Sequence, residues 1–469
     1  MEMKVFNSLT RHDEPLAPIA DNTIRMYTCG PTVYNFAHIG NFRAYTFEDI
    51  LRRTIQFNGM KVKQVMNLTD VDDKTIRGAN AAHVALTDYT KTYKDAFFAD
   101  LKKLNIQPAE MYPAATDHIP EMISLVERLI EKGVAYKSDD GSVYFAVTKF
   151  PGYGKLAHID FDSQRTGARC AADEYDKENV GDFALWKAWE ESDGPVGWDS
   201  PWGRGRPGWH IECSAMSMKY LGETFDLHTG GIDNLFPHHE NEIAQAEAAT
   251  GKEFVKTWMH CAHLKVNGEK MSKSAGNFFT LRDLIDKGWS GREIRYVLVN
   301  AHYRQGLNFA FSALEDARKS LARIDTCVDA LERVSGGVKA DGETPEFAKT
   351  ALEEFTAAIN DDLNTPKAFA ALFELVRHAN AWLQGGEVTA VQAAAVLDVF
   401  RRMDSVLGVV FFGKSAKEDV PTEIQALLNL RAEARKAKNW AESDRLRDEI
   451  AAAGWLVKDS RDGQSVTKK

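Results

Sequence analysis

Residues 25–68 read RMYTCGPTVYNFAHIGNFRAYTFEDILRRTIQFNGMKVKQVMNL. The first five have the composition of a short strand, which Gly30 and Pro31 end. A helix is predicted over residues 40–58, with Gly59 as its C-terminal stop. Residues 61–68 alternate Lys or Gln with Val, Met and Leu, as a strand does. A strand, a loop, a helix and a second strand in about 45 residues predict a βαβ unit, which opens a doubly wound nucleotide-binding sheet.

The rest of the chain divides into further parts. At 469 residues it is too long for one core, and we expect roughly three or four domains. The stretch after about residue 134 has short strand-like pieces, many glycines and polar runs, which indicates an insertion between two halves of the sheet. After about residue 290 the pattern is helical, and from Ile424 one charged helix precedes an apolar finish at Trp455.

The predicted fold class is therefore α/β: a Rossmann-like doubly wound catalytic domain with an inserted α+β segment, then a C-terminal helical bundle and a small tail domain. We expect the two halves of the catalytic domain at 1–115 and 203–268, the insertion at 116–202, a loop region at 269–340, the helical domain at 345–412 and the tail domain at 420–469.

The bulk composition is that of a soluble globular protein, with 44% hydrophobic and 27% charged residues. No stretch approaches the ~20 apolar residues of a membrane span, and the N-terminus does not resemble a signal peptide. The net charge of −10 argues against wholesale coating of nucleic acid but leaves room for a local basic patch. The five scattered cysteines predict reduced thiols or metal ligands. We expect a cytoplasmic protein with no membrane partner.

Residues 270–274 read KMSKS, and Ala275, Gly276 and Asn277 follow. Two lysines and two serines in a flexible loop suit an anion whose charge grows during a reaction, such as a triphosphate being cleaved. The alternative is a solvated basic turn. The chain has no GxxxxGK[ST] loop, so P-loop phosphate chemistry is not indicated.

His38, Gly40 and Asn41 lie where the first strand's loop enters the predicted helix. The N-terminus of a helix favours anions, and a glycine lets a nucleotide lie against the backbone. An imidazole at this position can donate a hydrogen bond to phosphate. The alternative is that His38 only caps the helix.

Two cysteines, a histidine and a glutamate form a candidate zinc set. The first cysteine ends the first strand, and the histidine and glutamate share one helical face at i and i+4. His239 is a second candidate, although by the same spacing it would pair with Ile243. The alternative is buried structural cysteines with a capping histidine, since no CxxC occurs. The set is Cys29, Cys213, His238 and Glu242.

The run Asp70, Val71, Asp72, Asp73 could be interpreted as a magnesium site. A strand-end loop with solvated carboxylates is the favoured interpretation.

Taken together, the HIGN turn (38–41) and the KMSKS loop resemble the paired signatures of class I aminoacyl-tRNA synthetases. The peptides CGPTVY, GWHIECSAMS and GGIDNLFPHHENEIAQ, which contain the candidate zinc ligands, are similar to the zinc-binding peptides of cysteinyl-tRNA synthetases. The resemblance runs from about residue 4 to the C-terminal tail. The chain departs from the usual HIGH tetrapeptide at Asn41, which cannot carry a proton at pH 7. That departure argues against any scheme in which this residue is a general acid.

This resemblance implies a cysteine–tRNA ligase. The enzyme would activate L-cysteine with ATP and Mg²⁺ to the adenylate, release pyrophosphate, and pass the acyl group to the 3′-terminal adenosine of the cysteine tRNA. One Zn²⁺ per chain would select the substrate thiol, because a hydroxyl is a poor zinc ligand. His38, Asn41, Lys270 and Lys273 would be catalytic, and His38, Gly40, Asn41 and Lys273 would bind ATP.

Thr69 and Trp209 would line the amino-acid pocket. The region 269–340 would contact the tRNA stem, 345–412 would form the anticodon-side domain, and 420–469 would bind tRNA. We expect a monomer. Two alternatives remain: a ligase that joins cysteine to an amino sugar in mycothiol synthesis, and a noncatalytic tRNA-binding paralogue.

Overall fold

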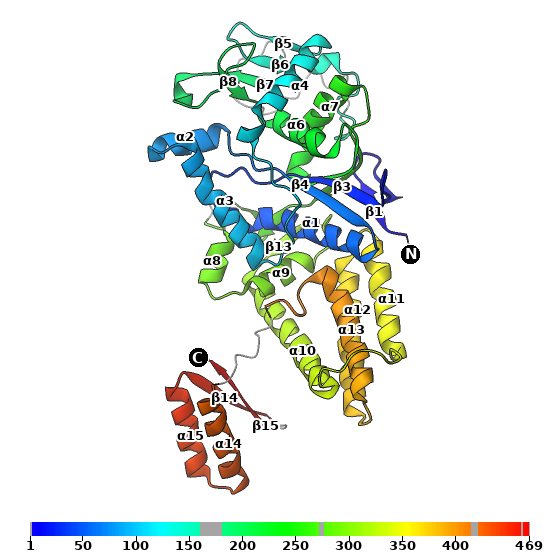
Figure 1. The fold of residues 1–469 in the computed structure, drawn as a ribbon, viewed down its shortest axis with the longest axis vertical. Coiled ribbons are helices and arrows are strands. Elements are labelled where there is room, and N and C mark those ends of the chain that lie inside the picture. The colour runs from blue at the N-terminus through cyan, green and yellow to red at the C-terminus, as the bar shows by residue number, and fades with distance from the viewer. Residues whose placement is uncertain (1, 160–180, 272–275, 414–420, 461–462, 469) are drawn as a thin grey trace. The chain divides into compact units, whose positions relative to one another are not determined.

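The computed structural model describes residues 2–159, 181–271, 276–413, 421–460 and 463–468 (Figure 1). The chain forms two compact units, Met1–Phe412 and Gly413–Lys469. The predicted Lys273 therefore lies outside the described residues.

The centre of the first unit is a parallel sheet of β3 (Thr23–Thr28), β4 (Lys61–Met66), β9 (Phe225–Gly231) and β10 (Val255–Cys261). Their order is β10-β9-β3-β4, and every neighbouring pair is parallel. From β3 the chain passes through α1 (Ile39–Phe57) to β4, whereas from β9 it passes through α7 (Glu240–Thr250) to β10. The chain thus leaves two adjacent strands in opposite directions. This switch point is where open α/β sheets bind ligands.

Alternating side chains bury both faces of the sheet. Met26 and Leu227 pack on one face with Phe47 of α1. Tyr27 and Phe225 pack on the other face, in the cluster that contains residues of α4, α6 and α7. The period of two along each strand places alternate side chains on the two buried faces. The predicted doubly wound α/β fold is confirmed.

A mixed segment separates the two halves of the sheet, as the composition predicted. It contains an antiparallel sheet in the order β5-β6-β7-β8. The helix α6 then leads back to β9. The elements from β4 to α6 are α2 (Asp73–Ala82), α3 (Leu86–Lys103), α4 (Ile119–Glu131), β5 (Ala135–Lys137), β6 (Val143–Phe145), β7 (Phe183–Ala188), β8 (Gly205–Pro207) and α6 (Trp209–Leu221), with short 3-10 turns at Ala115–His118, Val147–Lys149 and Glu191–Asp193.

Two small sheets flank the parallel one. The N-terminal hairpin pairs β1 (Lys4–Asn7) with β2 (His12–Pro15). The sheet β12-β11-β13 joins β11 (Leu264–Val266), β12 (Glu269–Lys270) and β13 (Leu307–Phe309). Because β12 ends at Lys270, this sheet positions the start of the predicted KMSKS loop.

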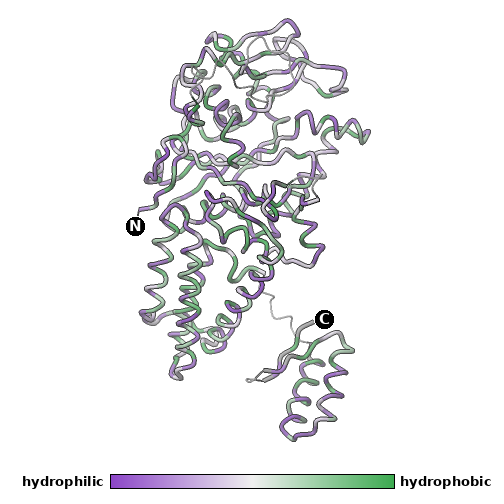
Figure 2. Tube along the Cα trace, turned by 180° about the vertical axis from the view of Figure 1, so that it is seen from behind, coloured by the Kyte–Doolittle hydropathy of each residue, from purple (hydrophilic) through white to green (hydrophobic). Residues whose placement is uncertain are grey.

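Helices form the rest of the first unit. They alternate between hydrophobic and hydrophilic residues along their length (Figure 2), and their apolar sides join the largest buried cluster. The Asn364 side chain caps α12 by accepting a hydrogen bond from the backbone N–H of Lys367, and Pro366 lies in the first turn. Among the described residues no helix is long and apolar enough to cross a membrane. The helices are α8 (Leu281–Asp286), α9 (Gly291–Val299), α10 (Phe311–Ser335), α11 (Glu346–Asn360), α12 (Thr365–Gln384) and α13 (Ala390–Leu407).

The second unit corrects one prediction. The tail contains two helices, α14 (Thr422–Lys436) and α15 (Trp440–Ala452), followed by the hairpin β14 (Trp455–Ser460) and β15 (Gly463–Lys468). The single predicted helix breaks at Lys438, which adopts φ 56°, and Asn439 caps α15. A run of alternating charges carries no apolar period that could reveal this break. The buried Arg431 guanidinium donates to both oxygens of Asp459, at 2.8 and 3.0 Å, and so joins helix to hairpin.

Candidate active site and metal centre

A cavity of about 510 Å³ opens at the switch point of the sheet. Cys29 and Gly30, at the end of β3, form part of its wall. The turn before α1, the β9–α7 connection, and the segments around His263 and Met271 complete the wall, with Trp209 of α6. His38, Gly40, Asn41 and Trp209 therefore face one space.

His38 is the N-cap of α1. Its Nδ1 accepts a hydrogen bond from the backbone N–H of Asn41 (3.2 Å), and the Asn41 Oδ1 accepts one from the backbone N–H of His38 (3.1 Å). This reciprocal pair is a capping box. The two interpretations of His38 are thus compatible, because the ring caps the helix and lines the cavity as well.

This cap also fixes the tautomer of His38. Since Nδ1 accepts a hydrogen bond, the neutral ring carries its proton on Nε2. Burial lowers the pKa of the imidazole, so that the neutral form dominates at pH 7. Asn41 contributes to this arrangement through its backbone N–H and its side-chain oxygen, and neither role needs a titratable proton. A residue that does not titrate at pH 7 therefore suffices for these cap contacts.

The KMSKS loop begins against this turn. A Cβ added at Gly40 would lie 2.7 Å from the Met271 Cε. The backbone N–H of Ile39 donates to the Phe279 carbonyl (3.0 Å), and Phe278 lies edge-on to His38 at 5.2 Å. The structure therefore brings the two signature segments together at one cavity, although the side chain of Lys270 and all of Lys273 lie outside what it describes.

The four predicted metal ligands converge from four elements. Cys29 follows β3, Cys213 lies in α6, His238 lies in the short helical turn Leu235–His239, and Glu242 lies in α7. One ligand atom from each lies within 4.8 Å of all the others, and all four residues are buried. The His238 Nε2 lies 3.1 Å from the Glu242 Oε1.

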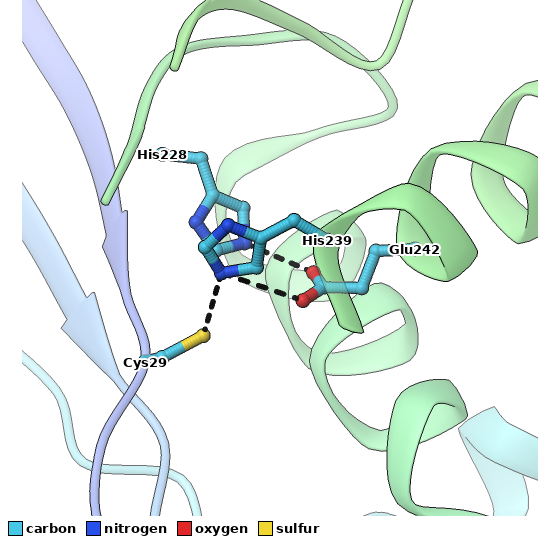
Figure 3. A group of neighbouring side chains, drawn as sticks. All are labelled: Cys29, His228, His239 and Glu242. Atoms are coloured by element: carbon cyan, nitrogen blue, oxygen red, sulfur yellow. Dashed lines mark hydrogen bonds and ion pairs between the residues drawn. The ribbon is translucent and has the colours of Figure 1, made fainter. Parts of the chain in front are cut away.

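A second, overlapping group consists of Cys29, His228, His239 and Glu242 (Figure 3). The His239 Nε2 lies 3.2 Å from the Cys29 Sγ, and the His228 Nε2 lies 2.9 Å from the Glu242 Oε2. The i, i+4 argument disfavoured His239, yet both histidines reach the site. The reason is that His239 precedes Glu242 by three residues and His238 precedes it by four, and both spacings place side chains on the same face of a helix.

The electrostatics of this cluster suit a divalent cation. Burial lowers the pKa of His238 and lowers that of His239 well below its usual range, which leaves both rings in the neutral, metal-binding form. Burial raises the pKa of the Cys29 thiol and of the Glu242 carboxyl. Among the described residues, the Glu242 Oε1 receives no hydrogen bond. Two thiols, an imidazole and a carboxylate match the donors that Zn²⁺ prefers. A dication at this site would favour the thiolate and carboxylate forms of the cysteines and Glu242.

Further imidazoles, which were not predicted from the sequence, orient the candidate ligands. The His210 Nδ1 lies 2.8 Å from the His238 Nδ1, and the His260 Nε2 lies 2.9 Å from the His239 Nδ1. The His260 Nδ1 in turn contacts the Ser8 Oγ at 2.7 Å. Such outer partners fix ring orientation at metal sites. His210 could have been suspected from its place in the Cys213 peptide, whereas His228 and His260 are single histidines on strands with no local signal.

The two predicted pocket residues differ in position. Trp209 is 40% exposed, lines the cavity and stacks on His238 with ring centroids 4.3 Å apart. Thr69 is buried behind the wall, where its Oγ1 donates to the Glu212 Oε2 at 2.8 Å. The structure therefore brings Trp209, but not Thr69, to the surface of the cavity.

Glu48 of α1 is a buried acid whose charge acts on Cys29, a residue of the cavity wall. Its Oε1 accepts a hydrogen bond from the Thr229 Oγ1 (3.0 Å), and its Oε2 finds no partner among the described residues. Burial raises the pKa of Glu48 to about 8. The carboxyl is therefore mainly protonated at neutral pH.

The acidic run after β4 is structural in its contacts. The buried Asp70 carboxylate accepts hydrogen bonds from Thr116 and forms an ion pair with Lys94. The expectation of a solvated carboxylate is therefore wrong for this residue. Asp72 caps α2, and Asp73 pairs with Lys187 of the inserted segment at 3.1 Å.

Comparisons with known proteins agree with this geometry. Residues 15–319 match the family model of the class I (C) tRNA synthetase catalytic domain, and residues 354–412 match the DALR domain. Residues 417–466 match the cysteinyl-tRNA ligase anticodon binding domain. The chain belongs to the cysteinyl-tRNA synthetase family. The predicted family and its enzyme class, aminoacyl-tRNA ligase, are thus confirmed.

Curated members of the cysteinyl-tRNA synthetase family align along nearly the whole chain. The cysteine–tRNA ligase of Protochlamydia amoebophila is 51% identical, with 100% of this chain and 98% of the relative covered. Those of Chlamydia pneumoniae and Brachyspira hyodysenteriae are 50% and 48% identical, with 94% and 99% of both chains covered, respectively.

Solved structures show the same fold at low identity. The methionyl-tRNA synthetase of Mycobacterium tuberculosis in complex with methionyl-adenylate superposes with a TM-score of 0.61 at 15% identity, covering 90% of this chain and 96% of the other. A putative arginyl-tRNA synthetase from Campylobacter jejuni gives 0.55 at 15% identity, covering 83% and 92%.

Proposed function

We propose that this protein joins L-cysteine to the cysteine tRNA in two steps at the switch-point cavity. Cysteine first attacks ATP to give cysteinyl-adenylate and pyrophosphate, and the acyl group then passes to the 3′-terminal adenosine. The observation that carries this proposal is that His38, Met271 and Cys29 line one cavity. A phosphate-binding turn, the start of a cationic loop and a thiol-rich metal centre thus face the same reactants.

The nucleotide end would work by positioning and charge. The Nε2–H of His38 would donate to a phosphate oxygen, at a helix N-terminus that favours anions. Asn41 would act through the cap that holds this ring. Lys270 and Lys273 would neutralise the departing pyrophosphate, with Mg²⁺ on the triphosphate. A loop that contacts the transition state more strongly than the substrate raises turnover more than affinity.

Cys29, Cys213, His238 and Glu242 would hold one zinc ion. When bound, zinc supplies a soft Lewis acid that accepts a thiolate far better than a hydroxyl. We assign the imidazole to His238 because Trp209, which lines the cavity, stacks directly on that ring. His239 would then support Cys29 from behind, held by His260.

Metal analysis of paired variants tests this assignment. His238→Ala should lose most of the one zinc per chain, whereas His239→Ala should keep it. The reverse pattern would move the ion to the group drawn in Figure 3. Each variant needs a circular dichroism spectrum to show that it folds.

The rival ligase, which joins cysteine to an amino sugar, is disfavoured by the C-terminal matches. The DALR match at 354–412 and the anticodon-binding match at 417–466 extend well beyond the catalytic domain. A noncatalytic paralogue is disfavoured by the preserved His38 cap and the clustered metal donors.

Cysteine-dependent ATP–pyrophosphate exchange, with serine as the control, tests the first step. Charging of the cysteine tRNA tests the second. Exchange with cysteine and not with serine, followed by charging, is the expected result. The absence of exchange with cysteine would overturn the proposal, and exchange followed by ligation to an amino sugar would favour the rival. We also expect a monomer, which sedimentation of the full chain would test.

A further inference from the structure

Two aromatic rings lie at the wall of the cavity, on the loop between β3 and α1. Tyr34 and Phe36 are each 36% exposed, although both are large side chains beside a buried core, and both line the cavity. Neither has a role in the chemistry described above. Together with Lys74 and Arg282 they form a surface that we call the aromatic rim.

Contacts with α3 hold the two rings in place. The Tyr89 hydroxyl donates to the Tyr34 carbonyl at 2.9 Å, and Tyr93 lies edge-on to Phe36 with ring centroids 5.4 Å apart. Tyr89 and Tyr93 also contact each other at 5.2 Å. The rim is therefore supported by a helix rather than carried on a free loop.

Each ring has a cation over it. The Lys74 Nζ lies 5.3 Å from the centroid of Tyr34, and within the described part of the chain this lysine has no carboxylate partner. The Arg282 Cζ lies 4.8 Å from the centroid of Phe36. Arg282 is held there by Asp100 and by the Ala96 carbonyl, each at 3.3 Å.

We propose that the aromatic rim stacks the unpaired nucleotides at the 3′ end of the tRNA. This inference rests on the proposed function, because it concerns how the second substrate reaches the cavity. Proteins bind single-stranded nucleic acid through aromatic rings that stack on bases and nearby cations that contact the backbone. The rim offers both, on a chain with a net charge of −10.

The rim suits the tRNA end better than it suits ATP. The triphosphate belongs at the N-terminus of α1 beside His38, where the helix and the KMSKS loop provide positive charge. Tyr34 instead lies next to Lys74 at the start of α2 and is tied to α3. The α2–α3 pair lies at the edge of the first unit in Figure 1.

Leucine and phenylalanine substitutions separate stacking from simple packing. Tyr34→Leu and Phe36→Leu remove the aromatic face but keep an apolar side chain, whereas Tyr34→Phe keeps the face. Trp189→Leu is the matched control, because Trp189 is also 38% exposed with an arginine at 5.4 Å but does not line the cavity. All variants are assayed as the full chain for cysteine-dependent exchange and for single-turnover transfer from preformed adenylate to tRNA.

We expect Tyr34→Leu and Phe36→Leu to slow the transfer at subsaturating tRNA by about 5- to 150-fold each, the range that loss of one base–aromatic stack implies. Exchange should stay within about twofold of wild type, and Tyr34→Phe and Trp189→Leu should behave as wild type. A tRNA with 2-aminopurine as its terminal base should lose fluorescence on binding wild type, and less on binding Tyr34→Leu.

Wild-type transfer rates in both leucine variants would overturn the inference. So would a raised KM for ATP in the exchange assay with transfer from preformed adenylate unchanged, since the rings would then hold the adenine of ATP. If a leucine variant does not fold, unchanged 2-aminopurine fluorescence on the wild-type enzyme decides against stacking. Failure of wild-type exchange would refute the proposed function instead, and is a separate result.

Discussion

Glu48→Gln should make the protein more stable, and by an amount that grows with pH. The wild-type carboxyl is buried, has one oxygen without a partner, and has a pKa of about 8 rather than the ordinary 4.5. Between these two values the unfolded chain releases the proton while the folded protein keeps it. The free energy of unfolding therefore falls as pH rises from about 4.5 to about 8, and below the lower value Glu48 adds no pH dependence.

The size of the effect follows from the shift. One pKa unit corresponds to about 1.4 kcal/mol, so the wild type should lose about 4 kcal/mol from this one group between pH 5 and pH 8. The glutamine amide has the shape of the protonated acid and cannot ionise. The stability difference between Glu48→Gln and wild type should thus increase by about the same 4 kcal/mol over that interval.

Differential scanning calorimetry of both proteins at pH 5, 6, 7 and 8, at one fixed zinc concentration, measures this difference. For a unit of this size a few kcal/mol corresponds to several degrees in Tm. Glu354→Gln, at an exposed position on α11, is the control and should follow wild type at every pH. An equal difference between Glu48→Gln and wild type at pH 5 and pH 8 would refute the reasoning, because the carboxyl would then be ionised at neutral pH.

Three further outcomes are expected. Cys213→Ser should abolish bound zinc in a metal analysis, and retention of one zinc per chain would remove this thiol from the site. Gly40→Val should lower the rate of ATP–pyrophosphate exchange at least tenfold with intact folding by circular dichroism, because a Cβ at this position would lie 2.9 Å from the His38 ring and displace it; unchanged exchange would show that this ring position is not needed. Asp459→Asn should destabilise the tail unit by about 1–2 kcal/mol in urea unfolding, since it weakens a charged hydrogen-bond pair with Arg431. The same pairing lowers the pKa of Asp459 to about 2. The stabilisation from this pair should therefore be present at neutral pH and be lost as the pH falls toward that value.

The central sheet could be predicted because its signals are local. Residues 25–68 contain a strand, a helix with a glycine stop and a second strand, and the structure has these elements within a few residues of the predicted bounds. The tail could not be predicted as well. The break between α14 and α15 depends on the left-handed conformation of Lys438. Lysine, unlike glycine or asparagine, gives no sequence signal for that conformation.

The residues of the candidate site were likewise only partly predictable from the sequence. Cys29, Cys213, His238 and Glu242 could be proposed because each lies in a recognisable peptide, and the structure brings them within ligand distance of one another. The choice between His238 and His239 could not be settled by helical spacing, since residues three and four positions before Glu242 both lie on its face of the helix. His228 and His260 reach the cluster only through the pairing of β9 with β10, which is a long-range property of the fold.

The His38–Asn41 cap has a consequence for the temperature dependence of the enzyme. Helix ends open locally at lower free energy than the core. Because the same ring that lines the cavity also closes the first turn of α1, fraying of that turn would release the imidazole from its orientation. Exchange activity should therefore decline at temperatures where calorimetry still shows a folded protein, and phosphate-bearing ligands should delay the decline by holding the turn closed.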